Sequence, residues 1–430
     1  MLYILFGSFV FMCLIRVPVA FALFLSATLT IIFEGNVPLT VVTQRIWTGL
    51  NNFPLLAVPF FLFVGQLMNE AGISKRLIDF SDSLVGHLKG GLSHVNVVVS
   101  MIFAGISGAS SADTAGVGSV LIPAMVNEGY GKGFTVGVTA ASSTLGNIIP
   151  PSIMMIVYAA SAGISVGAMF LTGVIPGILI GVGQMLLGYY YAKKHNIGGS
   201  RPFSWSSLWQ TGKIAIFPLL IPFIIIGGII GGIFTATEAS VIAAVYSIIL
   251  AFAYQRYSLS QFYRVMKRSI EQFSLSLFCV AAASLWGWVL AYYNIPQMVV
   301  ASAERWGLLN SPLSVMGFVV LVFLAVGTFM DAVPAIIILQ PIIGQIGKQV
   351  GIDPYHLGIV VVLTLAIGLV TPPYGLCLLI ASDLAKITVA DGFRALMPFI
   401  AISFAVVLIA VLLPDLMLWL PRLAMPEFIK

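Results

Sequence analysis

The sequence predicts an all-α polytopic membrane protein, built as an inverted repeat in which each half has five transmembrane helices and one re-entrant helical hairpin. Of its 430 residues, 60% are hydrophobic and only 8% are charged, against about 25% in an ordinary soluble domain. Apolar runs of about 20 residues, enough to cross the hydrocarbon core of a bilayer, recur as far as position 421. In addition, one order of motifs occurs twice along the chain.

Hydropathy, with Gly, Pro and charged residues as boundaries, predicts ten crossings. They lie near residues 2–15, 17–34, 53–71, 134–162, 167–192, 213–233, 236–254, 271–294, 355–385 and 394–421. Two further apolar segments, 91–127 and 313–347, are broken near the middle by small and polar residues and a carboxylate, which indicates hairpins that enter the membrane and return. We therefore expect a first repeat over 1–195, a linker over 196–212 and a second repeat over 213–425.

The first repeated motif contains a carboxylate. GISGASSADTAGVGSVLIP places Asp113 ten residues before Pro123, and GTFMDAVPAIIILQP places Asp331 ten residues before Pro341. The two aspartates are therefore 218 positions apart. A single match of this kind can arise by chance, so an internal repeat requires a second matching motif.

The second motif is a pair of prolines. GNIIPPS carries Pro150-Pro151, and GLVTPPYG carries Pro372-Pro373, 222 positions later. Two motif types in the same order at nearly the same offset favour a true repeat. Five crossings per half make the second half enter from the opposite face, the arrangement in which many secondary transporters place substrate and ion sites at the midplane.

The basic residues predict the topology. With both termini on one side, the other side collects 15 of the 20 Lys and Arg residues: Arg16, Lys75, Arg76, Lys89, Lys132, Lys193, Lys194, Arg201, Lys213, Arg256, Arg264, Lys267, Arg268, Lys386 and Arg394. Only Arg45, Arg305, Lys348, Arg422 and Lys430 remain opposite. By the positive-inside rule the rich side is cytoplasmic and both termini are periplasmic. The hairpin at 91–127 then opens from the cytoplasm and the one at 313–347 from the periplasm.

Segments 73–90 and 256–271, between predicted spans, are either amphipathic helices at the cytoplasmic interface or ordinary loops.

Several features point away from other classes of protein. The three cysteines lie far apart in apolar segments, so neither a disulfide framework nor a thiolate metal site is expected. The first apolar run has its cation after it and lacks a cleavage site, so we expect a retained span. The net charge of +5 is explained by topology, so no nucleic-acid partner is expected.

The irregular stretches at membrane depth are the candidate sites, because unpaired backbone in a bilayer must be buried in protein or line a wet cavity. The first hairpin offers Ser107, Gly108, Ser110, Ser111, Asp113 and Thr114, and the second offers the thinner set Gly327, Thr328, Met330 and Asp331. Freed carbonyls and nearby hydroxyls provide the oxygen ligands that hard cations prefer.

The proline pairs act through the backbone. Proline lacks an N–H and clashes with the preceding turn, so Pro150, Pro372, Pro373 and their neighbours free carbonyls in mid-helix. Gly146, Asn147 and Thr371 lie beside these breaks. We expect each half to form one cation site from a hairpin tip and a broken helix.

Asp113 and Asp331 have two open interpretations. A carboxylate at membrane depth is by default a functional candidate. It can equally accept hydrogen bonds from the hairpin's own N–H groups and stabilise the turn. There is no GxxxxGK[ST] phosphate loop, no HExxH and no Asp-rich metal pair, which argues against ATP coupling and an intramembrane enzyme.

Together, GISGASSADTAGVGSVLIP, GNIIPPS and their counterparts resemble the large membrane subunit (DctM-like, or M subunit) of tripartite ATP-independent periplasmic (TRAP) transporters, over essentially the whole chain. The arrangement is also similar to the divalent-anion/sodium symporters of the ion transporter superfamily. Those symporters carry Ser-Asn-Thr at the tips, whereas this chain has Ala112-Asp113-Thr114 and Met330-Asp331-Ala332. Individual ligands therefore cannot be transferred from them.

The resemblance implies an elevator in which a transport domain with both hairpins and both broken helices moves past a scaffold. It implies a periplasmic substrate-binding protein and a small four-helix membrane subunit (Q-type), here expected as a separate chain in the bacterial inner membrane. The two hairpin and broken-helix pairs of the repeat predict at least two sodium ions. It implies an organic anion substrate; we favour a sugar acid such as sialic acid (N-acetylneuraminate) over a C4-dicarboxylate. The alternatives are a stand-alone sodium/dicarboxylate symporter and a passive anion channel.

Overall fold

A computed structural model of the chain describes residues 2–197, 202–254, 258–305, 307, 309 and 311–429. These residues form helices joined by turns and loops, without a β-strand. Of the basic residues used for the topology, Arg201, Arg256 and Lys430 lie outside the described residues, as does part of the predicted linker at 196–212.

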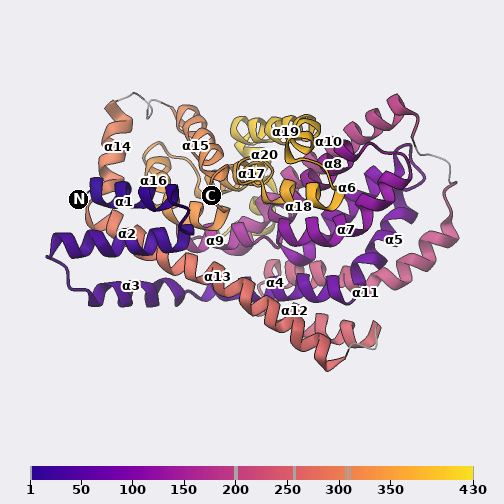
Figure 1. Cartoon of the computed structure of the whole chain (residues 1–430), viewed down its shortest axis with the longest axis horizontal. Coiled ribbons are helices and arrows are strands. Elements are labelled where there is room, and N and C mark those ends of the chain that lie inside the picture. Colours follow the sequence, from indigo (N-terminus) through magenta and orange to yellow (C-terminus); the bar gives the residue numbers. More distant parts are fainter. Residues whose placement is uncertain are drawn as a thin grey trace.

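The chain folds as two successive series of helices (Figure 1). The first series is α1 (Leu2–Leu14), α2 (Val19–Glu34), α3 (Thr40–Leu50), η1 (Phe53–Leu56), α4 (Ala57–Glu70), α5 (Ile73–Val85), α6 (Gly91–Ser107), α7 (Ser110–Asn127), α8 (Lys132–Ser143), η2 (Thr144–Asn147), α9 (Ile153–Ala162) and α10 (Val166–His195). The second is α11 (Trp205–Ile230), α12 (Ala236–Tyr254), α13 (Leu259–Tyr292), α14 (Ile295–Arg305), α15 (Pro312–Gly327), α16 (Ala332–Gln349), α17 (Pro354–Gly368), α18 (Leu376–Ala385), α19 (Val389–Leu412) and α20 (Pro414–Ala424).

Six helical segments of the described residues are long and apolar enough to cross a membrane. They are Phe53–Glu70, Val166–His195, Trp205–Ile230, Ala236–Tyr254, Leu259–Tyr292 and Val389–Leu412. The predicted spans at 2–15 and 17–34 correspond to the shorter apolar helices α1 and α2. The count of ten crossings and the opposite entry of the two halves stay predictions.

The structure differs from the sequence interpretation in three respects. Residues 259–271 are not a separate interfacial helix, because α13 continues without a break from Leu259 to Tyr292. The predicted span 394–421 is interrupted after Leu412, because Pro414 restricts the residue before it and Leu413 leaves the helical region at φ −123° and ψ 70°. The amphipathic helices α3 and α14 were not predicted at all.

The two hairpins and the two broken helices pack reciprocally. The returning hairpin helix α7 packs against α18 of the other half, and α16 packs against α9. The first pieces of the broken helices form the core: Phe134–Ser143 of α8 and every residue after Pro354 in α17 are buried. A helix that is apolar all round is typical of the core of a large protein or of a membrane span.

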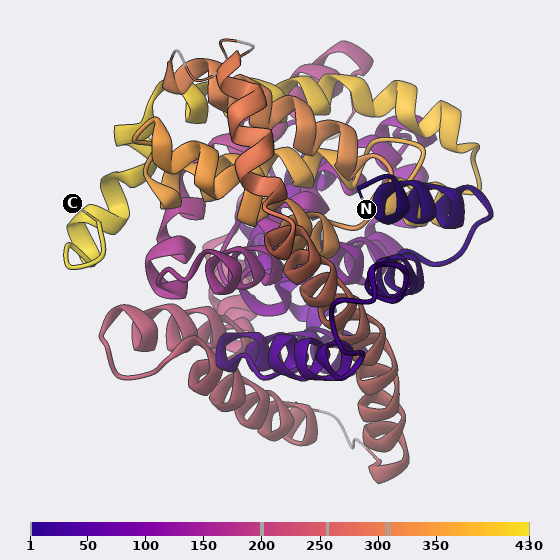
Figure 2. The same ribbon diagram turned by 90° about the vertical axis from the view of Figure 1, so that its left-hand side faces the viewer.

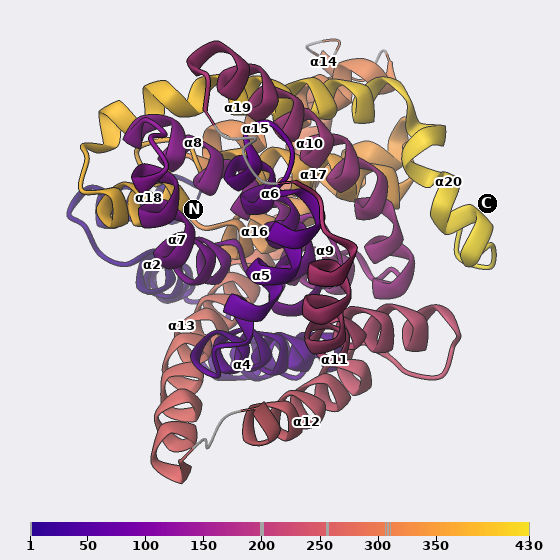
Figure 3. The same ribbon diagram turned by 90° about the vertical axis from the view of Figure 1, so that its right-hand side faces the viewer.

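The long helix α13 separates this core from the outer helices. It packs against α2, α3 and α4 on one side and against α16 on the other. Figure 2 shows it running from the edge formed by α11 and α12 toward α14, and Figure 3 shows α4, α11 and α12 grouped below the hairpins and broken helices. The candidate site residues therefore lie on the inner side of α13.

Candidate functional site

The first hairpin closes around a buried carboxylate. α6 ends at Ser107, and Gly108 adopts φ +63°, a conformation that favours glycine, before α7 begins at Ser110. The Ser107 hydroxyl donates to Asp113 Oδ1 at 2.5 Å and accepts from the Ala109 amide at 3.3 Å. Asp113 Oδ2 and Ser110 Oγ are buried and have no hydrogen-bond partner among the residues that the structure describes. Such groups are rare and require an explanation, for which a bound ion is one candidate.

The first broken helix touches this tip directly. The amide of Ile153, which follows the cis Pro150-Pro151 bond, donates to the Gly108 carbonyl at 3.3 Å. A Cβ added to Gly108 would lie 2.8 Å from the Pro151 carbonyl oxygen. A Cβ added to Gly146 would collide with Asp113 Oδ2 and lie 3.2 Å from the Ser110 amide nitrogen. The glycines therefore allow the broken helix to approach the hairpin closely.

The second pair repeats the same backbone contacts. The amide of Tyr374, which follows the cis Pro372-Pro373 bond, donates to the Thr328 carbonyl at 2.9 Å. A Cβ added to Gly368 would lie 2.7 Å from the Gly327 carbonyl carbon. The hairpin tip and the proline break are thus joined by one amide-to-carbonyl bond in each half.

The side chains of the second pair are arranged differently. Asp331 caps α16, with Oδ1 accepting from the Ala332 amide at 2.6 Å, and it is exposed. The Thr328 hydroxyl donates to the Ala325 carbonyl at 2.7 Å, and that of Thr371 donates to the Ile367 carbonyl at 2.8 Å. The protons of these hydroxyls are therefore engaged within their own turns, whereas the oxygens keep their lone pairs.

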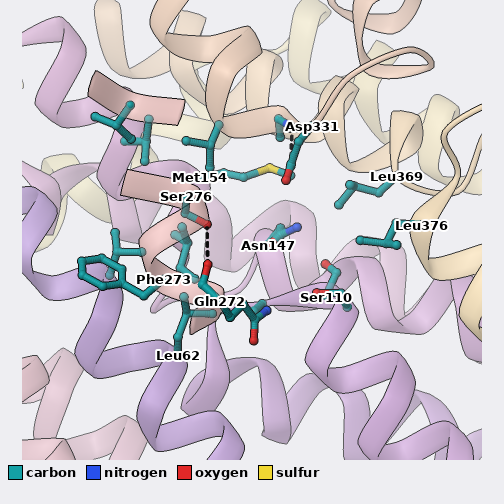
Figure 4. A pocket seen from close by; sticks show the side chains of 18 of the residues that line it. Leu62, Ser110, Asn147, Met154, Gln272, Phe273, Ser276, Asp331, Leu369 and Leu376 are labelled. Carbon is teal, nitrogen blue, oxygen red and sulfur yellow. Dashed lines mark hydrogen bonds between the residues drawn. The ribbon is translucent and has the colours of Figure 1, made fainter. Parts of the chain in front are cut away.

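A cavity lies between the two tips, and it encloses about 820 Å³ including its open mouth. Figure 4 shows Ser110, Asn147 and Asp331 around it, with Gln272 and Ser276 of α13 opposite. Both tips, both breaks and the outer helices contribute: Ala109, Ser110, Ser111, Asn147, Ile153, Met154, Val157, Asp331, Ala332, Val333, Leu369, Leu376, Cys377, Leu55, Val58, Leu62, Gln272, Phe273, Ser276, Leu277 and Val280. It is the junction of the two halves with α4 and α13.

The predicted site residues fall into two groups. Ser110, Ser111, Asn147 and Asp331 line the cavity. The others lie in the hairpin tips and helix breaks but are not among the residues that line the cavity: Ser107, Gly108, Asp113, Thr114, Gly146, Pro150, Gly327, Thr328, Met330, Thr371, Pro372 and Pro373. The Thr114 hydroxyl donates to the Ser110 carbonyl at 2.8 Å. Whether any of them binds sodium stays a prediction.

Sequence reasoning missed the wall formed by α13. Gln272 and Ser276 stand four residues apart, on one face of a helix, and both line the cavity. Two polar side chains with this spacing in an apolar span could have identified α13 as a wall of the cavity from the sequence. Leu62 and Cys377 carried no such signal, because only packing brings them to the cavity.

Comparison with known proteins agrees with this architecture. A crystal structure of the YdaH transporter of Alcanivorax borkumensis superposes with a TM-score of 0.62 over 87% of each chain, at 12% sequence identity. At that identity the likeness concerns the fold alone.

Similarity in sequence is much higher to several permeases. The C4-dicarboxylate TRAP transporter large permease protein DctM of Vibrio cholerae is 36% identical over 97% of each chain. The sialic acid TRAP transporter large permease protein SiaM of the same species is 34% identical, covering 94% of this chain and 95% of that one. The isethionate TRAP transporter permease protein DctMQ of Oleidesulfovibrio alaskensis is 36% identical over 96% of this chain, which spans 65% of that protein.

The family model for the DctM component of tripartite ATP-independent periplasmic transporters matches residues 6–416. The chain therefore belongs to the DctM family, the large multi-pass membrane permeases of TRAP transporters.

Proposed function

We propose that this permease imports an organic anion together with sodium, and that the first cation site lies at the tip of the first hairpin. The observation that supports this most directly is the pair of buried, unpartnered oxygens, Asp113 Oδ2 and Ser110 Oγ, beside a cavity that Ser110 also lines. A carboxylate with hydroxyl and carbonyl oxygens suits a hard cation. The N-terminal end of α7 carries a partial positive charge that would repel a cation. The negative charge of Asp113, in the first turn of α7, would outweigh this repulsion.

The second cation site is proposed at the equivalent place, between Thr328, Asp331 and Thr371. Energetics support at least two sodium ions. One sodium with a monoanion moves no net charge, whereas two leave one positive charge, worth about 2.3 kcal/mol per 100 mV. That corresponds to about fiftyfold accumulation before the sodium gradient is counted.

For the motion, we propose an elevator. The cavity is bounded on one side by the hairpins and broken helices and on the other by α4 and α13. Sliding the first group, as one body, along α13 would carry the cavity contents across the membrane without opening a continuous pore. An anion channel would need no such division.

For the substrate and partners, relatives supply the classes. Their names refer to sialic acid, C4-dicarboxylates and isethionate, all organic anions, and we favour a sugar acid for this chain. We propose that a periplasmic binding protein delivers it and that a small membrane subunit is a separate chain. In DctMQ, of which this chain spans 65%, additional sequence accompanies the permease part. We place the complex in the inner membrane, with both termini periplasmic.

The test is uptake of radiolabelled N-acetylneuraminate and, separately, succinate into proteoliposomes that contain the permease with its small subunit. Each is measured with and without a sodium gradient and with and without the binding protein. We expect uptake only with both, with a Hill coefficient for sodium above one. Uptake without sodium would favour a channel, and rapid uptake without the binding protein would favour a stand-alone symporter.

A further inference from the structure

A second cavity lies beside the central one, and a single positively charged side chain lines it. It encloses about 910 Å³ including its mouth. Leu55 and Val280 line both cavities and are both buried, so the two spaces are neighbours that share this wall. We call the second space the outer cavity, because α3, the end of α9, the last third of α13 and the middle of α16 surround it, all in the half that the topology predicts to be periplasmic.

Arg45 is the cation, and the fold fixes its position. Gly49 of α3 lies directly against Ser284 of α13, where an added Cβ would collide with the serine side chain. Arg45 lies four residues before Gly49, and Trp288 lies four residues after Ser284. The guanidinium carbon of Arg45 is 5.1 Å from the centre of the Trp288 ring. This matches two helices running antiparallel with Gly49 at the point of close approach. A cation over an indole face is an attractive contact.

The stacked guanidinium keeps its hydrogen-bonding capacity free. The Trp288 ring also stacks on Tyr292, at 5.2 Å between centroids, which restricts its orientation. In the part of the chain that the structure describes, Arg45 forms no salt bridge and donates no side-chain hydrogen bond. No acidic residue is among the described residues that line the outer cavity. A planar guanidinium with unused N–H groups matches a carboxylate by a two-point contact.

The rest of the lining is neutral and combines apolar residues with four polar side chains. Thr48, Asn52, Ser161 and Ser284 provide hydroxyl and amide groups around Arg45. They can bind hydroxyl or carbonyl groups of a ligand but cannot neutralise a second negative charge. The lining therefore fits a hydroxylated monocarboxylate better than a dicarboxylate.

From this geometry we infer that the outer cavity is an entry site, where Arg45, held by Trp288, binds the substrate carboxylate before it passes the Leu55–Val280 wall into the central cavity. The inference rests on the proposed uptake function but concerns a different place and different residues. Because the site has one positive charge, it selects for an anion at entry and leaves sodium binding to the hairpin tips.

The test uses cysteine labelling, which needs neither a sodium gradient nor transport. In a permease with Cys13, Cys279 and Cys377 replaced by alanine, Thr48→Cys places a thiol on α3 three residues after Arg45. Right-side-out membrane vesicles are treated with the anionic reagent MTSES, the cationic MTSET, or uncharged methyl methanethiosulfonate as a measure of access. We expect Arg45→Gln to lower the ratio of MTSES to MTSET rates at this introduced thiol by about fivefold, the order expected for one nearby charge in a partly wet site. Arg45→Lys should keep the ratio.

Ligand binding is then read as protection of the introduced thiol from the uncharged reagent. We expect N-acetylneuraminate to protect with Arg45 present and not in Arg45→Gln, succinate to protect more weakly, and neutral N-acetylmannosamine not to protect. The matched control is Ser302→Cys with and without Arg305→Gln, a pair with the same spacing on α14 outside both cavities. There the charge should change the reagent ratio, without any protection by the anions.

The entry site would be overturned if neither anion protected the thiol of the Thr48→Cys variant, or if protection were equal after Arg45→Gln. Succinate protecting better than N-acetylneuraminate would overturn the substrate class. Neither result would affect the sodium dependence measured by uptake. Conversely, sodium-independent uptake with Arg45-dependent protection would contradict the proposed coupling and leave the entry site standing.

Discussion

The two hairpin and broken-helix pairs share a backbone arrangement but differ in their polar side chains. In both, an amide shortly after the cis proline pair donates to a carbonyl of the hairpin tip, from Ile153 to Gly108 and from Tyr374 to Thr328. The first tip then buries a carboxylate with a free oxygen. The second exposes its carboxylate, which caps α16.

The difference shows which part of the repeat is constrained by folding. Backbone groups at membrane depth must be satisfied in both halves, so the glycines and prolines that allow the close approach recur. Side-chain ligands are not needed for that purpose and are free to diverge. We therefore expect changes in the backbone frame to destabilise both pairs, and changes in polar side chains to affect mainly the first pair.

The largest effect is expected for Gly368→Ala. Its Cβ would lie 2.7 Å from the Gly327 carbonyl carbon, and backbone cannot rotate away, so we expect a loss of about 3 kcal/mol in stability. Gly146→Ala meets mainly the movable Asp113 side chain and should lose about 1–2 kcal/mol. The measurement is thermal unfolding in detergent, with Gly317→Ala, which has open space around it, as the matched control. A larger loss for Gly146→Ala would break the comparison.

Asp113→Asn should come next, with uptake as the readout. It removes the charge that accepts the Ser107 bond and leaves the proposed cation site neutral. A hydrogen bond to a charged group is worth about 1.5–3 kcal/mol, so sodium-driven uptake should fall about 10- to 100-fold. Asp331→Asn keeps an oxygen for the Ala332 amide and should cost less than about fivefold.

The control for both is Asp383→Asn, at a carboxylate that is 78% exposed and paired with Lys386 at 3.0 Å. It should leave uptake unchanged. Equal losses for Asp113→Asn and Asp331→Asn, at matched expression, would mean that the two carboxylates have one role after all.

The smallest effects concern the residues beside the prolines. Asn147→Ala removes an amide that lines the cavity, and the sodium concentration for half-maximal uptake should rise about three- to tenfold. Thr371→Ala should raise it only about twofold, because Thr371 is not among the residues that line the central cavity. Thr364→Ala, which removes a similar hydroxyl bond to Val360 in α17, the helix that precedes Thr371, should leave sodium dependence unchanged. If neither Asn147→Ala nor Thr371→Ala exceeds this control, these residues do not belong to cation sites.

Much of the architecture followed from the sequence. Hydropathy and proline placement indicated an all-helical membrane protein, and the motifs around Asp113 and Pro150 indicated the family that the comparisons show. These signals are local: a run of apolar residues or a proline pair acts on the backbone at its own position. The continuity of α13 and the break at Leu413 were not recognised, although Pro414 was a visible reason for the latter.

Only the tertiary structure decided how the site is closed. Sequence reasoning left Asp113 and Asp331 with the same two interpretations, and packing gave them different surroundings, since only Asp113 is enclosed by Ser107 and Gly146. The α13 wall and the stacking of Arg45 on Trp288 join residues that lie far apart in the chain. Such contacts depend on how helices pack against one another, which no local pattern specifies, whereas composition and periodicity specify only that the helices form and which of them the bilayer can accept.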